Sequence, residues 1–254
     1  MRSPSRLALI AVLCLSAIGA VSVFAAGEGE AGESGGRNES VDYLGVAAVM
    51  IRDGNFERAL SALEQVDLEA EDTDLERFYT LAGLVALRLG EPAIAIENFE
   101  LALQQGQTDS TLFVYLAQAY YTENRFQDAI DAINQVPNLN QFPALYGVLA
   151  ESYWRTEQRD VAYQTLERAI GLFPSQSQLL RQQIFYLVEL NLTQEAAEKG
   201  LLYLERLEDS PAAYVTVGEA LRRGGNPDQA ARTLEEGRLR HPGDEQIQLA
   251  LAQA

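Results

Sequence analysis

Side chains suited to catalysis are scarce in this 254-residue chain. His241, the only histidine, stands between Arg240 and Pro242. A catalytic or metal-binding histidine needs further reactive side chains around it, and such a site would have to be built around this turn. No glycine-rich phosphate loop stands between a strand and a helix, and no segment has a convincing strand pattern. We therefore predict a solvated turn at His241, no enzymatic activity, no bound metal and no cofactor.

A dense run of carboxylates is the second candidate for chemistry. Oxygen ligands of this kind can bind Ca²⁺, but the run lacks the central glycine and the spacing of a helix–loop–helix calcium site. We interpret it as a solvated loop between two helical units, and a docking patch for a basic partner is the alternative. The residues of the run are Glu64, Asp67, Glu69, Glu71, Asp72, Asp74 and Glu76.

An alanine that recurs every 33 to 36 residues indicates the elements that position these residues. An aromatic or leucine residue stands sixteen positions before each alanine. Most of the alanines are also followed, four positions later, by a bulky apolar residue. The alanines are Ala59, Ala95, Ala129, Ala162, Ala196 and Ala230. The preceding residues are Tyr43, Tyr79, Phe113, Tyr146, Leu180 and Tyr214. The following residues are Leu63, Phe99, Ile133, Leu166, Gly200 and Leu234.

Each period contains two amphipathic helices. Tyr146, Leu149, Ala150 and Tyr153 follow offsets of 0, 3, 4 and 7, which place them on one face of a helix. The small residue at the third of these positions lets the partner helix approach closely. Glycine or asparagine stands five residues before most of the alanines, where the first helix should end in a left-handed residue. These are Gly54, Gly90, Asn124, Asn191 and Gly225, with Glu157 as the exception.

This pattern resembles the tetratricopeptide repeat. The resemblance implies an all-α, right-handed superhelical solenoid of about six helix–turn–helix repeats over residues 40–254. Glu245 to Ala254 would form a C-terminal capping helix. The fifth repeat is the least regular, because Gln183 and Gly200 stand where apolar bulk is expected. We expect that repeat to pack more loosely or to shift its register.

The resemblance also implies where a partner binds, because first helices line the concave groove of such solenoids. Groove positions five and eight residues after the aromatic position are largely apolar, and arginines follow in the C-terminal half. An extended or helical apolar segment with an acidic flank would fit this surface. The same positions can instead pack between neighbouring first helices. The predicted groove residues are Leu84, Leu87, Gln118, Tyr121, Glu151, Trp154, Arg155, Arg181, Phe185 and Arg222.

The N-terminus has the pattern of a secretory signal, with a basic start, an apolar stretch and small residues at its end. We predict a signal peptide over residues 1–25 and a flexible, acidic, glycine-rich linker over residues 26–39. The alternative is an uncleaved membrane anchor through residues 7–26. Both place the repeats outside the cytoplasm, and we predict the periplasm of a double-membrane bacterium. The lone Cys14 falls within this segment, so a cleaved chain has no cysteine.

Net charge excludes two classes of partner. A formal charge of −18 at pH 7 repels nucleic-acid phosphates and anionic lipid surfaces. The leading hypothesis is a non-enzymatic scaffold or adaptor that binds a protein or peptide segment in a bacterial envelope complex. A membrane-tethered structural subunit that mediates oligomerisation is one alternative. An accessory factor of an envelope enzyme or secretion system is another. The sequence specifies neither the partner, the pathway nor the oligomeric state.

Overall fold

The computed structural model describes residues 41–206 and 209–253, and these residues contain helices and no strand. The predicted signal peptide and linker lie outside the described residues. The chain divides into two compact units, Met1–Arg125 and Phe126–Ala254. No helix within the described part has the length and apolar composition needed to cross a membrane. The all-α fold class predicted from the sequence is therefore confirmed.

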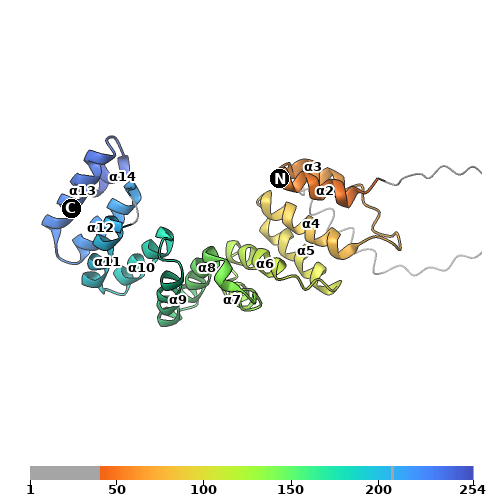
Figure 1. Cartoon of the computed structure of the whole chain (residues 1–254), viewed down its shortest axis with the longest axis horizontal. Coiled ribbons are helices and arrows are strands. Elements are labelled where there is room, and N and C mark those ends of the chain that lie inside the picture. Colours follow the sequence, from red (N-terminus) through yellow and green to blue (C-terminus); the bar gives the residue numbers. More distant parts are fainter. Residues whose placement is uncertain (1–40, 207–208, 254) are drawn as a thin grey trace, which may run out of the picture. The chain divides into compact units, whose positions relative to one another are not determined.

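The first unit contains two complete helix pairs and one further helix (Figure 1). Its helices are α2 (Tyr43–Arg52), α3 (Phe56–Leu63), α4 (Leu75–Arg88), α5 (Pro92–Gln104) and α6 (Ser110–Thr122). The second unit continues the alternation and ends on a short helix after the last pair. Its helices are α7 (Phe126–Asn134), α8 (Pro143–Arg155), α9 (Arg159–Leu172), α10 (Ser177–Glu189), α11 (Thr193–Arg206), α12 (Pro211–Arg223), α13 (Pro227–Arg240) and α14 (Glu245–Leu251), with a 3₁₀ turn at Leu139–Gln141.

Local sequence sets where the helices begin and end. The Asp42 carboxylate accepts a hydrogen bond from the Gly45 amide at 2.8 Å, and Asp74 caps α4 in the same way through the Arg77 amide. At the turns within repeats, Gly54, Gly90 and Gly225 have positive φ angles, as predicted. The remaining turns also use the left-handed region, with φ values of 59° at Asn124, 62° at Glu157 and 62° at Asn191. Even the exceptional glutamate therefore adopts the conformation that the repeat requires.

Burial confirms the helix register read from the alanine period. Each of the repeating alanines, from Ala59 to Ala230, has a relative exposure of 0%. Close approach at the small first-helix positions is also observed. A Cβ atom added at Gly83 would lie 2.5 Å from the Phe99 ring, and one at Gly218 would lie 2.6 Å from Leu234. The fold therefore depends on pairing a small residue on one helix with a bulky residue on the next.

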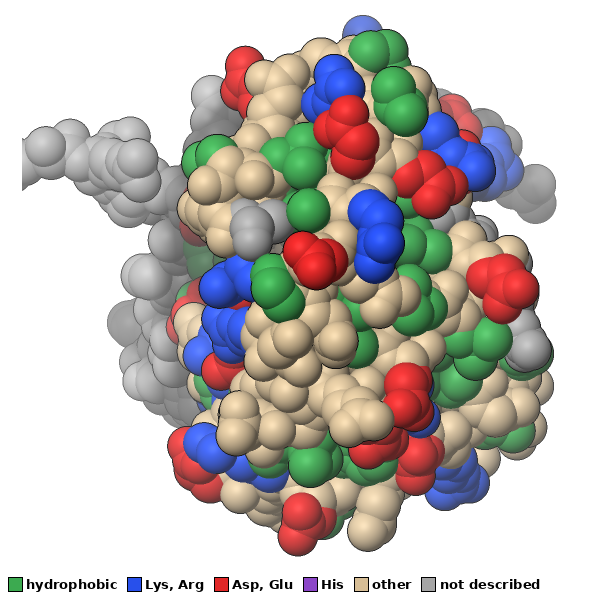
Figure 2. Space-filling model, turned by 90° about the vertical axis from the view of Figure 1, so that its left-hand side faces the viewer, with side chains coloured by type: hydrophobic (Ala, Val, Ile, Leu, Met, Phe, Trp, Pro, Cys, Tyr) green, Lys and Arg blue, Asp and Glu red, His purple; other side chains and the backbone are tan. Residues whose placement is uncertain are grey.

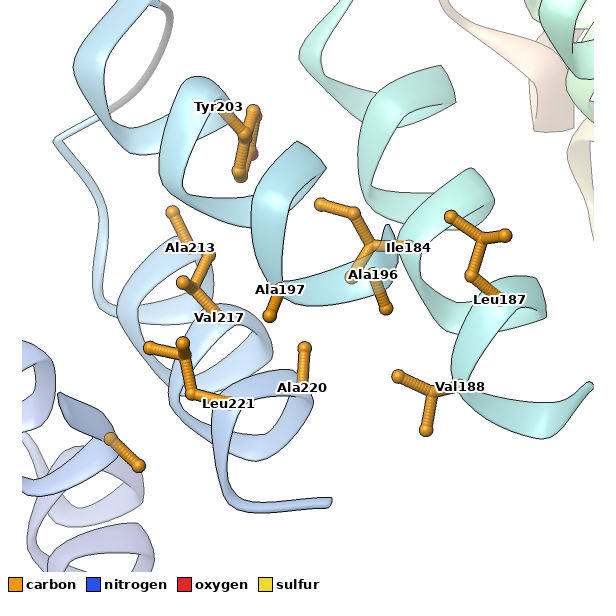
Figure 3. Close-up of a cluster of buried hydrophobic side chains, with 11 residues drawn as sticks. Ile184, Leu187, Val188, Ala196, Ala197, Tyr203, Ala213, Val217, Ala220 and Leu221 are labelled. Atoms are coloured by element: carbon orange, nitrogen blue, oxygen red, sulfur yellow. The ribbon is translucent and has the colours of Figure 1, made fainter. Parts of the chain in front are cut away.

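The fifth repeat keeps its register, so the shift expected there is not found. Ile184 fills the position that is small in most repeats and is fully buried in the cluster shown in Figure 3. Gly200 replaces the usual bulky residue, and a Cβ atom there would lie 3.1 Å from Val217 of α12. Large and small side chains have thus exchanged helices in this repeat. Gln183, at 2% exposed, is buried despite its amide.

Candidate functional site

The predicted groove residues lie on first helices of both units. In the first unit, Leu84 and Leu87 of α4 and Tyr121 of α6 are partly buried, whereas Gln118 of α6 is exposed. In the second unit the residues come from α8, α10 and α12.

Trp154 forms an aromatic stack at the junction of α8 and α10. Its ring lies 4.1 Å, centroid to centroid, from the ring of Tyr186, and the planes differ by only 7°. Tyr186 is fully buried, whereas Trp154 remains partly exposed. The Arg159 guanidinium lies 5.3 Å from the centre of the Trp154 ring, within cation–π range. Trp154 therefore packs between neighbouring first helices and still presents part of its surface to solvent.

A hydrogen-bond network ties α10 to α8 beside this stack. The Tyr186 hydroxyl donates to Oε2 of Glu151 at 2.7 Å. The Gln182 amide donates to the Tyr186 hydroxyl at 2.9 Å and to the Gly147 carbonyl at 3.1 Å. The other oxygen of Glu151 accepts from Arg155 at 2.9 Å. Glu151 and Arg155, predicted as groove residues, thus also bond within the chain and fix the orientation of the aromatic stack.

Beside the stack, α10 exposes an apolar ring and a cation one turn apart. Phe185 is 52% exposed, and its ring centroid lies 6.1 Å from that of Tyr186. Arg181 precedes it by four residues, so both lie on the same side of the helix. The Arg181 guanidinium donates to the neutral Gln178 side chain at 2.8 Å, and no ion pair is seen for it among the described residues. We call Arg181, Phe185 and Trp154 the α10 patch.

The arginines of α12 are already engaged. Arg222 forms a bidentate pair with Glu219, with distances of 2.9 and 2.8 Å. Arg223 bonds to Glu219 at 2.6 Å and to Glu189 of α10 at 3.3 Å. The hydrogen bond from Arg222 is the main cause that lowers the pKa of the Glu219 carboxyl. The sequence suggested that Arg222 offers its positive charge to an acidic ligand. Glu219 already compensates that charge within the chain.

This ion-pair cluster yields a pH-dependent expectation. Because the folded-state pKa of Glu219 lies below its unfolded value, its stabilisation is present above the unfolded pKa and disappears as pH falls through the folded pKa. Glu219→Gln should lower the free energy of unfolding at pH 7 by less than about 1 kcal/mol, since the pair is partly exposed. Urea unfolding of both proteins should show that the difference in their free energies of unfolding becomes smaller towards pH 3. A gap that stays constant with pH would contradict the assignment.

His241 lies in an exposed turn, as predicted, but its own ring is partly covered. Its side chain is 25% exposed, and its Nε2 lies 3.1 Å from an oxygen of Asp209. Its ring centroid lies 6.0 Å from that of Tyr214. Arg240 also bonds to Asp209, at 3.3 Å. This arrangement joins the segment before α12 to the end of α13 within a solvated turn, in which Arg240, Pro242 and Gly243 are exposed.

The acidic run has its own local structure. The Asp67 carboxylate accepts a hydrogen bond from the Glu69 amide at 3.0 Å, and Asp74 is occupied in capping α4. Within the described part of the chain, no group of three or more histidine, cysteine or acidic side chains converges as a metal site would require.

Comparison with known proteins decides the family. Three models described as tetratricopeptide repeat match residues 86–152, 143–176 and 211–254, which together cover more than half of the chain. The chain belongs to the tetratricopeptide repeat family. Its described helices fit an all-α repeat solenoid, the fold of a protein–protein interaction scaffold. A search of curated proteins found no significant match.

Solved structures of tetratricopeptide repeat type share this fold at low sequence identity. The C-terminal part of a repeat protein from Cytophaga hutchinsonii has a TM-score of 0.70 and 16% identity, covering 83% of this chain and 84% of that one. PilW, described as a widely conserved type IV pilus biogenesis factor, has a TM-score of 0.64 and 14% identity, covering 85% and 100%. YrrB, described as having an unusual peptide-binding site, has a TM-score of 0.54 and 17% identity, covering 77% and 96%.

Sequence reasoning missed Tyr186, the buried partner of Trp154. The position six residues after the aromatic position holds Val85, Ala119, Ser152 and Ala220 in other repeats, so Tyr186 is the one aromatic ring there among the later repeats. A large ring at a position that is otherwise small or medium-sized was an available signal. To be buried there, the Tyr186 ring needs space on the neighbouring helix and a flat side chain to pack against. Trp154 of α8 provides that side chain.

Proposed function

We propose that this tetratricopeptide repeat protein is a non-enzymatic adaptor that binds a protein segment along its first helices, with the α10 patch as a main contact. The observation that carries the proposal is Phe185, a residue that is 52% exposed beside the ordered stack of Trp154 and Tyr186. An exposed aromatic ring on a rigid support suits a binding hot spot, because little side-chain freedom remains to be lost on binding.

The chemistry of the patch narrows the partner. An apolar side chain would pack against Phe185 and the open part of Trp154, and a carboxylate would bind Arg181. Arg155 and Arg222 contribute less attraction because Glu151 and Glu219 already neutralise them. In the first unit, Leu84 and Leu87 add an apolar surface of the same kind. The partner segment is thus apolar with a local acidic residue, rather than strongly acidic along its length.

We propose an extracytoplasmic setting for this binding, in the periplasm. The basic and apolar pattern at the N-terminus supports it, whether that segment is cleaved or retained as an anchor through residues 7–26. Similarity of fold to PilW, a pilus biogenesis factor, is consistent with a role in an envelope complex. Formal charge disfavours nucleic acid as a partner.

Site-directed photocrosslinking in the native cell tests the proposal. A photoreactive amino acid at position 185 of the full chain should form one dominant protein adduct, whereas the same group at Leu172 of α9 should not. Leu172 is a matched control because it is 47% exposed. Once the adduct is identified, Phe185→Ala should weaken its binding by about 30-fold, as truncation of a hot-spot residue does. Equal binding by this variant and by Leu172→Ala would refute the site.

A further inference from the structure

Helix α14 repeats the features with which the first helices of the second unit begin. The Asp244 carboxylate accepts a hydrogen bond from the Ile247 amide at 2.9 Å. At the same place one repeat earlier, the Ser210 hydroxyl accepts one from the Ala213 amide at 3.3 Å. Ile247 is fully buried, and its equivalents at intervals of 34 residues are 5% exposed or less: Leu145, Leu179 and Ala213. Because α14 packs on α12 as α12 packs on α10, it is the first helix of a seventh repeat (Figure 1).

The same interval continues one row of groove positions onto α14. Arg181 of α10 is a predicted groove residue, and Val215 of α12 and Leu249 of α14 follow it at successive intervals of 34 residues. Val215 is partly exposed, and Leu249 is 63% exposed. Figure 2 looks onto this end of the second unit, where hydrophobic side chains reach the surface between charged ones. We call Arg181, Val215 and Leu249 the groove row.

An exposed leucine is unexpected on a helix that only closes a solenoid. The outer face of a terminal cap is polar, because it meets water. The other exposed residues of α14 follow that rule and are Glu245, Gln246 and Gln248. Leu249 departs from it at the position that continues the groove row. It therefore extends an apolar surface that already includes Phe185 and Val215, and a surface of this kind marks an interaction site.

We propose that the binding surface extends from the α10 patch along the groove row to α14, and that it binds a protein segment with one carboxylate followed by apolar side chains. The inference rests on the proposed function and adds the extent of the site and the order of the residues that it recognises. The carboxylate binds Arg181, and the apolar side chains cover Phe185, Val215 and Leu249.

Charge sets the order of residues in the segment. Arg181 donates to the neutral Gln178 side chain, and no ion pair is seen for it in the described part of the chain. On α12, by contrast, Glu219 already compensates Arg222. On α14, the exposed Glu245 would repel a carboxylate. The acidic residue of the partner is therefore placed at α10, and its apolar residues lie towards α14.

The spacing of the helices sets the shortest length of the segment. Axes of packed helices lie about 8–10 Å apart, so about 16–20 Å separate α10 from α14. A fully extended chain spans at most about 3.5 Å per residue. The partner residues that contact Phe185 and Leu249 must therefore lie at least about five positions apart in its sequence.

Photocrosslinking at position 249 of the full chain in the native cell tests the extension. A photoreactive amino acid there should capture the same protein that position 185 captures. Mass spectrometry of the digested adducts should place both crosslinks in one segment, at least about five residues apart. Leu239 of α13 is the matched control, because this leucine is 69% exposed on a second helix. The same group at position 239 should not capture that protein.

The affinity for the crosslinked segment, synthesised as a peptide, gives an independent measurement. Leu249→Gln should weaken binding about tenfold, because it removes an apolar contact. Leu239→Gln should bind as the wild type does, and circular dichroism should show that both variants are folded. Replacing the acidic residue of the peptide by its amide should weaken binding to the wild type but not to Arg181→Gln.

The results separate the extension from the α10 patch itself. Capture at position 185 without capture at position 249, or equal affinities of Leu249→Gln and the wild type, overturns the extension and leaves the proposed function standing. An adduct at position 249 with a different protein, or with another copy of this chain, overturns the extension as well. Absence of a partner at both positions refutes the extension and the proposed function together.

Discussion

Replacing Ala162 by leucine should lower the free energy of unfolding by about 1–3 kcal/mol, as overpacking of a filled core does. Ala162 is fully buried and belongs to a cluster with Tyr146, Ala150 and Leu166. The added atoms have no space unless α8 and α9 move apart. Because each repeat supports its neighbours, the disturbance should extend to the adjoining helices. Thermal melting followed by circular dichroism should show a decrease of roughly 5 °C.

Gln164→Leu provides the control on the same helix. Gln164 is exposed, so the same new side chain adds no core overlap there. Its effect on stability should stay within about 0.5 kcal/mol, as for most surface substitutions. Equal melting temperatures for the two variants would show that the alanine of each repeat does not mark the contact between its helices.

The fold could be predicted because the same contact between helices recurs in each repeat. One buried alanine would be weak evidence, but alanines from Ala59 to Ala230 at a near-constant period define the register of each second helix. Repeat five shows where prediction from a repeat pattern fails. Gln183 and Gly200 predicted looser packing or a shifted register, whereas the structure compensates with Ile184 on the facing helix. That compensation depends on the shape of the space between helices, which a position-by-position pattern does not contain.

The binding site was less predictable than the fold. Sequence position identified Trp154 and Phe185 as first-helix surface residues, but it could not show that Trp154 stacks on Tyr186. Nor could it show that Arg222 is neutralised by Glu219 while Arg181 bonds to a neutral amide. These outcomes depend on side-chain rotamers and on distances between helices. The partner itself is outside the chain, so no internal pattern records it.

Trp154→Ala should weaken partner binding and destabilise the fold together, whereas Phe185→Ala should affect binding alone. Removing the indole leaves one side of the buried Tyr186 ring without its stacking partner. The loss includes about 0.5–1.5 kcal/mol of aromatic pairing in addition to the buried area. We expect a total near 2 kcal/mol, less than for a fully buried tryptophan, because Trp154 is partly exposed. Urea unfolding measures this loss of stability, and titration with the partner identified by crosslinking measures binding.

Trp154→Phe separates the two effects, because a phenyl ring can keep the stack on Tyr186. Its stability should lie within about 1.5 kcal/mol of the wild type. Trp154 is the only tryptophan, so the wild-type protein also offers a direct readout of the site. Its emission should be partly protected from acrylamide in the free protein and more protected with partner bound. Full protection in the free protein, with partner affinity unchanged in Trp154→Phe, would mean that Trp154 only supports the packing of α8 and α10. Binding would then depend on Phe185 and Arg181 without a contact from the indole.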